Sequence, residues 1–135
     1  MSNEPELNAS STATLIVGPQ DLASSIASVT GDSFPPVFAT ARMVALMEVA
    51  ASRILAPFCG PGELSVGVTV DINHTAPTPL GAAVTATARY AGREGKLFVF
   101  EVSCADKGGE VGRGWHKRAL VSSERLQSGA ARRAG

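Results

Sequence analysis

Residues 38–58 read FATARMVALMEVAASRILAPF, and this stretch decides the fold. Alanine, leucine and methionine are strong helix formers and dominate it, so we expect one helix from about Thr40 to just before Pro57. The Thr40 hydroxyl can cap the first turn, and Pro57 ends the helix because it has no N–H and clashes with the preceding turn. One apolar stripe follows the helical repeat: Met43, Met47, Ala50, Ala51 and Ile54.

Glu48 lies on the flank of that stripe, beside Val44, Ala51 and Leu55. A carboxylate away from water is costly unless it is paired or neutralised. Glu48 therefore reaches solvent, pairs with an arginine, or has a functional role. The flank is so apolar that it needs a second surface to cover it, and a symmetric second copy is the commonest solution. We therefore expect a homodimer; an association of two such dimers stays open.

Composition indicates a single globular domain. The chain has 135 residues, 44% of them hydrophobic, and its twelve basic and twelve acidic residues cancel. This balance does not favour nucleic-acid binding. We expect a loose terminus over residues 1–8, one domain over residues 9–126, and a disordered, polar and basic tail over residues 127–135.

Targeting signals and metal motifs are not recognisable in the sequence. Its start is acidic and polar, unlike a signal peptide, and no apolar run is long enough to span a membrane. Cys59 and Cys104 are typical of reduced packing residues in a cytoplasmic protein. Neither His74 nor His116 has the partner spacing of a zinc site, so we expect no metal.

After the helix, the hydrophobic pattern changes to that of strands. Residues 64–74 alternate apolar and polar side chains, which predicts a strand with one buried face. Turns of hairpin length separate most of the later strands, so the strands should pair antiparallel. The fold class is therefore α+β, with a curved antiparallel sheet wrapped around the long helix. Five strands are expected, at residues 10–17, 64–74, 83–90, 96–105 and 110–124.

Three residues together have the composition of an acyl-transfer site. Thr40 offers a hydroxyl beside the free N–H groups of a helix start, Glu48 offers a carboxylate, and His74 offers a proton carrier at a strand end. Each also has a simpler interpretation: a helix cap, a solvated or paired acid, and a packing histidine. In the last strand, His116 and Arg118 should share one face.

Several blocks of the sequence together resemble the fluoroacetyl-CoA thioesterase family, whose members have a hotdog fold. The similarity runs from about residue 34 to residue 126, and the spacing of Thr40, Glu48 and His74 matches the family's catalytic set. The matching blocks are Phe34-Pro-Pro-Val-Phe-Ala-Thr40, Met43-Val-Ala-Leu-Met-Glu48, Ala56-Pro57, Gly67 to His74-Thr-Ala-x-Thr-Pro, and Gly112-x-Gly-x-His-x-Arg118-Ala.

The resemblance implies a hotdog dimer with a site at the subunit interface, and hydrolysis of a short acyl-CoA to acid and CoA without a cofactor. It implies that the matched set is catalytic. Gly67 would lie beside the thioester, Arg118 near the acyl group, and Phe34 would close over the substrate. Residues 23–33 depart from the family's bulky lid because they are mostly small and polar. Two alternatives are a hotdog module that binds acyl-CoA or an acyl carrier without turnover, and a hotdog hydratase.

Overall fold

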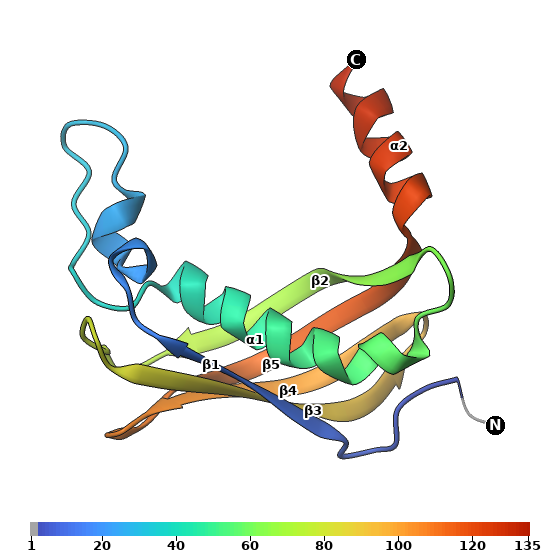
Figure 1. The fold of residues 1–135 in the computed structure, drawn as a ribbon, viewed down its shortest axis with the longest axis horizontal. Coiled ribbons are helices and arrows are strands. Elements are labelled where there is room, and N and C mark those ends of the chain that lie inside the picture. The colour runs from blue at the N-terminus through green and yellow to red at the C-terminus, as the bar shows by residue number, and fades with distance from the viewer. Residues whose placement is uncertain (1–2) are drawn as a thin grey trace.

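A five-stranded antiparallel sheet wraps around one long helix in the computed structural model, which describes residues 3–135 (Figure 1). The helix is α1 (Thr40–Leu55). The sheet order is β1-β3-β4-β5-β2, so β1 and β2 form its two edges. All strand pairs are antiparallel, which confirms the predicted α+β class. The strands are β1 (Ser10–Ile16), β2 (Glu63–His74), β3 (Ala83–Glu94), β4 (Leu97–Asp106) and β5 (Gly109–Ser122).

The helix α1 has the predicted extent, but it begins differently. Ala39, in extended conformation, is the N-cap, and Thr40 is the first helical residue. The Thr40 hydroxyl instead makes a hydrogen bond with Nδ1 of His74, so the prediction that it caps the helix is wrong. At the other end the chain tightens into a 3₁₀ turn (Ala56–Phe58), where Pro57 removes an N–H.

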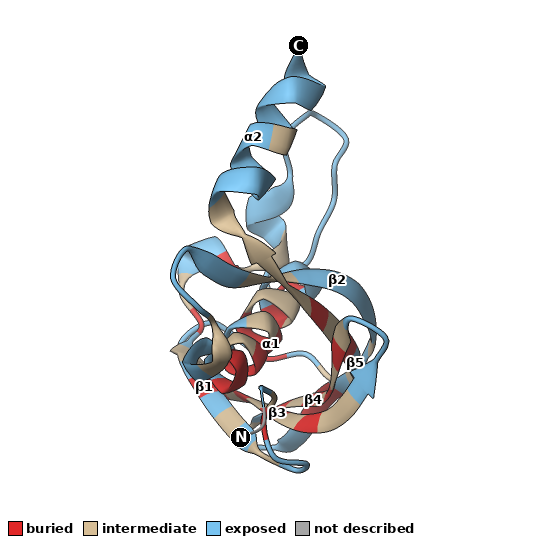
Figure 2. Cartoon of the chain, turned by 90° about the vertical axis from the view of Figure 1, so that its right-hand side faces the viewer, coloured by how far each residue is buried: buried red, intermediate tan, exposed pale blue. Residues whose placement is uncertain are grey.

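The core lies between α1 and the inner face of the sheet (Figure 2). Alternate residues of β3 and β4 are buried, as a period of two requires. The helix contributes its apolar stripe and also Leu55, which is fully buried within the chain. The expectation that Leu55 needs a second copy to cover it is therefore wrong. The buried strand residues are Val84, Ala86, Ala88 and Tyr90 on β3 and Phe98, Phe100, Val102 and Cys104 on β4.

The strand β2 lies at an edge of the sheet, and its residues are exposed or half-buried. None of its residues is buried, and Val68 and Val70 are 51% and 45% exposed. The predicted strand is confirmed, but its predicted buried face is wrong for the single chain. Only β5 pairs with it, and the register shifts between Gly67 and Thr69, which breaks the alternation. An exposed apolar edge is a surface suited to pairing with another chain.

The connection from β1 to α1 contains two short 3₁₀ turns (Pro19–Asp21 and Ala23–Ile26) and stands beside the start of α1 (Figure 1). Asp21 anchors it. The fully buried carboxylate of Asp21 accepts hydrogen bonds from the Gly18 N–H at 2.8 Å and from Nε of Arg42 at 3.0 Å. The base of the connection is thus tied to the first turn of α1, whereas its tip is exposed.

The N-terminal segment is attached to β3, although a loose terminus was the expectation for residues 1–8. The Tyr90 hydroxyl donates to the Glu4 carboxylate at 2.6 Å, and Nη1 of Arg89 donates to the Asn8 side chain at 2.6 Å. Residues 4–8 therefore lie against the sheet. The part of that expectation which concerns residues 1 and 2 lies outside the described residues.

The chain ends in a second helix, α2 (Ser123–Ala134), which projects away from the sheet (Figures 1 and 2). The disorder expected for residues 127–135 does not match this structure. Ser122 caps the helix by accepting the Arg125 N–H at 3.2 Å, and two arginines in the last turn interact favourably with the helix dipole. No helix within residues 3–135 has the length and apolar character that crossing a membrane requires.

Candidate functional site

Thr40 and His74 meet at the start of α1. His74 is the last residue of β2, and its Nδ1 lies 2.8 Å from the Thr40 hydroxyl. The Phe38 ring contacts the His74 ring edge-on, with the centroids 6.4 Å apart. Nε2 of His74 is buried and has no hydrogen-bond partner within residues 3–135. Because buried polar atoms are nearly always paired, this nitrogen is available to a ligand or to a second chain.

A hollow of about 380 Å³ lies beside this pair. Phe34, which is 45% exposed, lines it together with Thr40 and His74. The three residues, all expected at the site, are therefore brought together by one chain. The remaining lining residues are Ala23, Pro35, Val37, Phe38, Thr75, Ala76 and Pro77.

Glu48 lies in a second cluster, further along α1. Nη1 of Arg118 donates to Oε1 of Glu48 at 3.1 Å, and Arg118 is only 6% exposed. Of the interpretations open for Glu48, pairing with an arginine is thus observed. The Glu48 side chain itself is 40% exposed. A buried cation therefore fixes a carboxylate that stays accessible.

Two further residues hold Arg118 in place. Ser65 accepts from Nε with its hydroxyl at 3.0 Å and from Nη2 with its carbonyl oxygen at 2.9 Å. His116 places Nε2 3.0 Å from Nη1 of Arg118, and its Nδ1 lies 2.8 Å from the carbonyl oxygen of Thr69. Burial is the largest influence on the pKa values of Arg118 and His116, and it lowers both.

Gly67 faces the same carboxylate from β2. A Cβ atom at this position would collide with Oε1 of Glu48 and lie 3.1 Å from Cε1 of His116. The glycine is therefore required for close approach between the strand and the acid. Gly67 on β2 is paired with Arg118 on β5, and both residues approach Glu48 from the sheet.

The two clusters do not meet within one chain. Thr40 and Glu48 are eight residues apart on α1, which separates them by about 12 Å along the helix axis. The expected convergence of Thr40, Glu48 and His74 is thus seen only for Thr40 and His74. Metal-binding groups of three or more His, Cys, Asp or Glu side chains were not found in the part of the chain that the structure describes.

Sequence reasoning missed Ser65 and the contacts of His116. The shared face of His116 and Arg118 was a usable signal, because residues two apart on a strand lie side by side. No local signal marked Ser65. It reaches Arg118 only because β2 pairs with β5, where Ser65 lies opposite Leu120.

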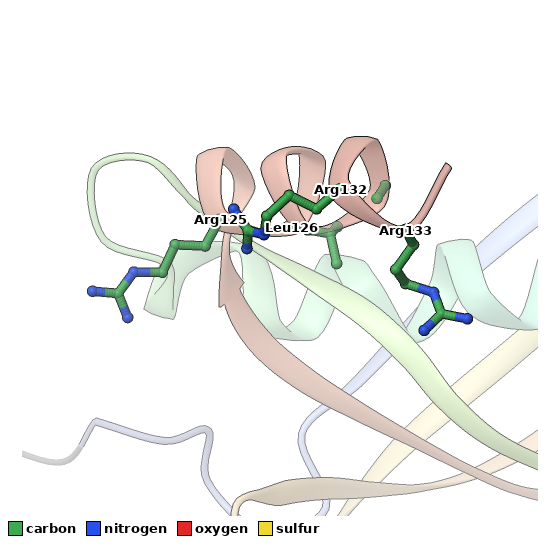
Figure 3. Close-up of a pocket in the computed structure, with 6 residues that line it drawn as sticks. Arg125, Leu126, Arg132 and Arg133 are labelled. Atoms are coloured by element: carbon green, nitrogen blue, oxygen red, sulfur yellow. The ribbon is translucent and has the colours of Figure 1, made fainter. Parts of the chain in front are cut away.

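A larger hollow, of about 620 Å³, lies along α2 and has no acyl-transfer chemistry (Figure 3). Its lining comes entirely from one exposed helix and includes no carboxylate, hydroxyl or imidazole. Figure 3 shows its arginine side chains extending from the helix. The lining residues are Arg125, Leu126, Gly129, Ala130, Arg132 and Arg133.

Comparison with known proteins gives matches at the level of sequence and of structure. Residues 17–124 match the family described as fluoroacetyl-CoA-specific thioesterase. A fluoroacetyl-CoA thioesterase from Streptantibioticus cattleyicolor is 44% identical over 95 residues, which cover 70% of this chain and 68% of that protein.

Solved structures agree with the sequence matches. The fluoroacetyl-CoA thioesterase FlK superimposes with a TM-score of 0.87 at 36% identity, over 94% of this chain and 96% of that one. A hot-dog-like protein from Thermanaerovibrio acidaminovorans superimposes with a TM-score of 0.82 at 25% identity, over 96% and 93% of the two chains. The predicted hotdog fold is confirmed, and the chain belongs to the fluoroacetyl-CoA-specific thioesterase family.

Proposed function

We propose that this chain hydrolyses a short acyl-CoA thioester to the free acid and CoA, without a cofactor. The observation that carries the proposal is the Glu48 carboxylate, which is 40% exposed and which buried Arg118 holds against β2 at Gly67. An accessible, oriented acid of this kind suits attack on a thioester. Membership in the family supports a hydrolase over a module that binds without turnover.

Glu48 has two alternative roles in the chemical step. As a general base, it takes a proton from a water molecule whose oxygen attacks the thioester carbon. As a nucleophile, its own oxygen attacks, and water then hydrolyses the mixed anhydride. In both cases the carbon–sulfur bond breaks, and the departing CoA sulfur takes up a proton that His74 carries. First-turn N–H groups of α1 or the N–H of Gly67 stabilise the oxyanion.

We propose that a second copy of the chain completes the site. The support is that one chain keeps the Thr40–His74 pair about 12 Å from Glu48 along α1. Antiparallel pairing of two β2 edges about their middle would place the His74 end of one strand beside the Gly67 half of the other. The Thr40–His74 pair of one copy would then share a cleft with Glu48 of the other.

Phe34 is proposed to cover the acyl group, because it lines the hollow beside His74. Its neighbours at residues 23–33 are mostly small and polar, so we propose that the site accepts short acyl groups in addition to fluoroacetyl. Arg118 is proposed to act on Glu48 instead of on the acyl group, since its hydrogen bonds go to protein groups.

A CoA-release assay over acetyl-, haloacetyl-, short branched and aromatic acyl-CoA tests the proposal. We expect turnover of at least one short ester by the wild type, and a fall in kcat of about 10²-fold or more in His74→Ala, because the proton carrier is lost. Lys107→Ala is the control. Lys107 is exposed in the turn between β4 and β5, outside the proposed site and interface, and this variant should keep the wild-type rate.

Failure of the wild type to release CoA from any ester would contradict the proposal. Calorimetry with the same esters then separates the alternatives, because tight binding without release identifies a binding module. Hydration of a crotonyl-type ester would identify a hydratase.

Replacing Gly67 with alanine tests the close approach of β2 to Glu48. The added methyl group must displace the carboxylate or the ring of His116, so kcat should fall by about 10²-fold while KM changes less. Gly129→Ala is the control, because its Cβ atom would meet only Nη2 of Arg132, at 3.9 Å. Steady-state CoA release measures both, and an unchanged kcat in Gly67→Ala would remove Gly67 from the site.

The location of the protein is also a proposal. Cys59 and Cys104 are free thiols, and burial raises the pKa of the Cys104 thiol to about 11. Unpaired cysteines are typical of a reducing compartment, so we propose that the enzyme works in the cytoplasm.

A further inference from the structure

His116 is enclosed between the Glu48–Arg118 pair and the irregular part of β2. It is 1% exposed, although histidines are often found at surfaces. Its Nδ1 lies 2.8 Å from the carbonyl oxygen of Thr69, directly after the register shift, and its Nε2 lies 3.0 Å from Nη1 of Arg118. Both ring nitrogens therefore have protein partners, and neither is left for substrate.

The partners determine the protonation state of the ring. A guanidinium nitrogen donates hydrogen bonds and accepts none, so Nε2 of His116 must accept from Arg118. A carbonyl oxygen only accepts, so Nδ1 must carry the proton that it donates to Thr69. His116 is therefore a neutral imidazole with its proton on Nδ1.

Burial and the charge of Arg118 favour this neutral form and lower the pKa of His116, although the hydrogen bond to Thr69 and the charge of Glu48 act in the opposite direction. The charged groups that face the ring are Arg118 on its own strand and Glu48 from α1, whose Oε1 lies 4.0 Å from Nε2. On β4 the residue opposite is Phe100, which carries no charge. A proton on Nε2 would turn the Arg118 contact into two facing cations, and burial also lowers the pKa of His116.

We propose that His116 is a positioning residue that, as the neutral Nδ1–H imidazole, orients Arg118 and through it Glu48. The proposal rests on the proposed thioesterase function. Nη1 of Arg118 has two hydrogens, of which one goes to Glu48 and the other to His116. Without the acceptor on His116, a buried N–H is left unpaired and the guanidinium loses one of the contacts that fix its plane.

Two variants separate the functions of the ring nitrogens. In His116→Gln, the amide oxygen takes the place of Nε2 and still accepts from Arg118. In His116→Asn, the shorter amide reaches the carbonyl oxygen of Thr69 but not Arg118. We expect His116→Gln to keep kcat within about 3-fold, and His116→Asn to lose about 10-fold or more in kcat with KM changed less.

Val102→Ala is the control for stability, because it opens a cavity in the neighbouring strand β4, where Val102 lies opposite Gly114 instead of His116. The proposal is overturned if His116→Asn keeps the wild-type kcat. It is also overturned if the His116 variants and Val102→Ala show the same relation between the loss of kcat and the loss of thermal midpoint. The role of His116 would then be purely structural.

Nitrogen-15 NMR of the imidazole tests the tautomer without any substrate. We expect His116 to stay neutral, with its proton on Nδ1, through the pH range in which exposed histidines become charged. A proton on Nε2, or charging at an ordinary pH, would rule the proposal out. This readout remains valid if no acyl-CoA is hydrolysed, so the failure of the proposed function and the failure of this inference are distinguishable.

Discussion

Replacing Glu48 with glutamine is expected to lower kcat by about 10³-fold or more while the fold is kept. The amide retains the shape of the side chain but neither takes up a proton nor attacks a thioester. It also leaves Arg118 without the anion that it faces at 3.1 Å. Because Arg118 is only 6% exposed, the loss of its partner charge should also lower the thermal midpoint, although the glutamine oxygen can still accept a hydrogen bond from Nη1.

Glu94→Gln is the matched control for this experiment. Glu94 also pairs with a cation, Lys117 at 2.9 Å, but it lies at the exposed end of β3, away from the cluster. Its removal should leave kcat unchanged. The role proposed for Glu48 fails if Glu48→Gln releases CoA at the wild-type rate, or if both variants lose activity equally.

The variant Val68→Asp is expected to yield an inactive monomer. Val68 is 51% exposed on the edge strand β2, and a two-fold axis through this edge would bring the two aspartates close together. The second copy would be repelled and the composite site lost, so activity should fall by about 10²-fold or more. Light scattering and CoA release, measured over the same dilution series, report the two effects together.

Ile16→Asp provides the comparison at the opposite edge of the sheet. Ile16 is 67% exposed on β1, so its replacement adds the same charge to an edge that we do not propose as an interface. This variant should stay dimeric and active. A fully active monomer of Val68→Asp, or of the diluted wild type, would refute the shared site.

The helix and the central strands were predictable because local sequence carries their pattern. The stripe of α1 and the alternation of β3 repeat with the periods of a helix and a strand, and the same side chains are buried in the structure. The alternation of β2 is equally clear in sequence. It does not report burial, because exposure at a sheet edge depends on which strands pair, and the sequence does not show this.

The helix α2 was not expected from the sequence, for a related reason. Residues 127–135 are polar and basic, which is typical of disorder, but alanine and arginine also favour a helix. The cap at Ser122 starts α2 directly at the end of β5. The composition of residues 127–135 alone does not reveal this cap, because Ser122 lies before them.

The sequence suggests candidate residues for the site but not how they are grouped in space. Thr40 and His74 are separated by 34 positions, and only the meeting of a helix start with a strand end makes them neighbours. Residue chemistry suggested Thr40, Glu48 and His74, and the resemblance to a family added Phe34, Gly67 and Arg118. The Glu48–Arg118 contact depends on the pairing of β5 with the rest of the sheet. Long-range contacts of this kind leave no periodic trace in one sequence.

The hydrogen bonds of the Arg118 guanidinium group restrict which substitutions the sequence can accept over evolutionary time. The guanidinium distributes its hydrogen bonds from three nitrogens to the Ser65 hydroxyl, the Ser65 carbonyl oxygen, Glu48 and His116. A lysine side chain has one nitrogen and cannot reach all of these acceptors, so position 118 should not tolerate the common substitution of arginine by lysine. Substitutions at residue 65 should then covary with residue 118, although 53 positions separate them in the chain.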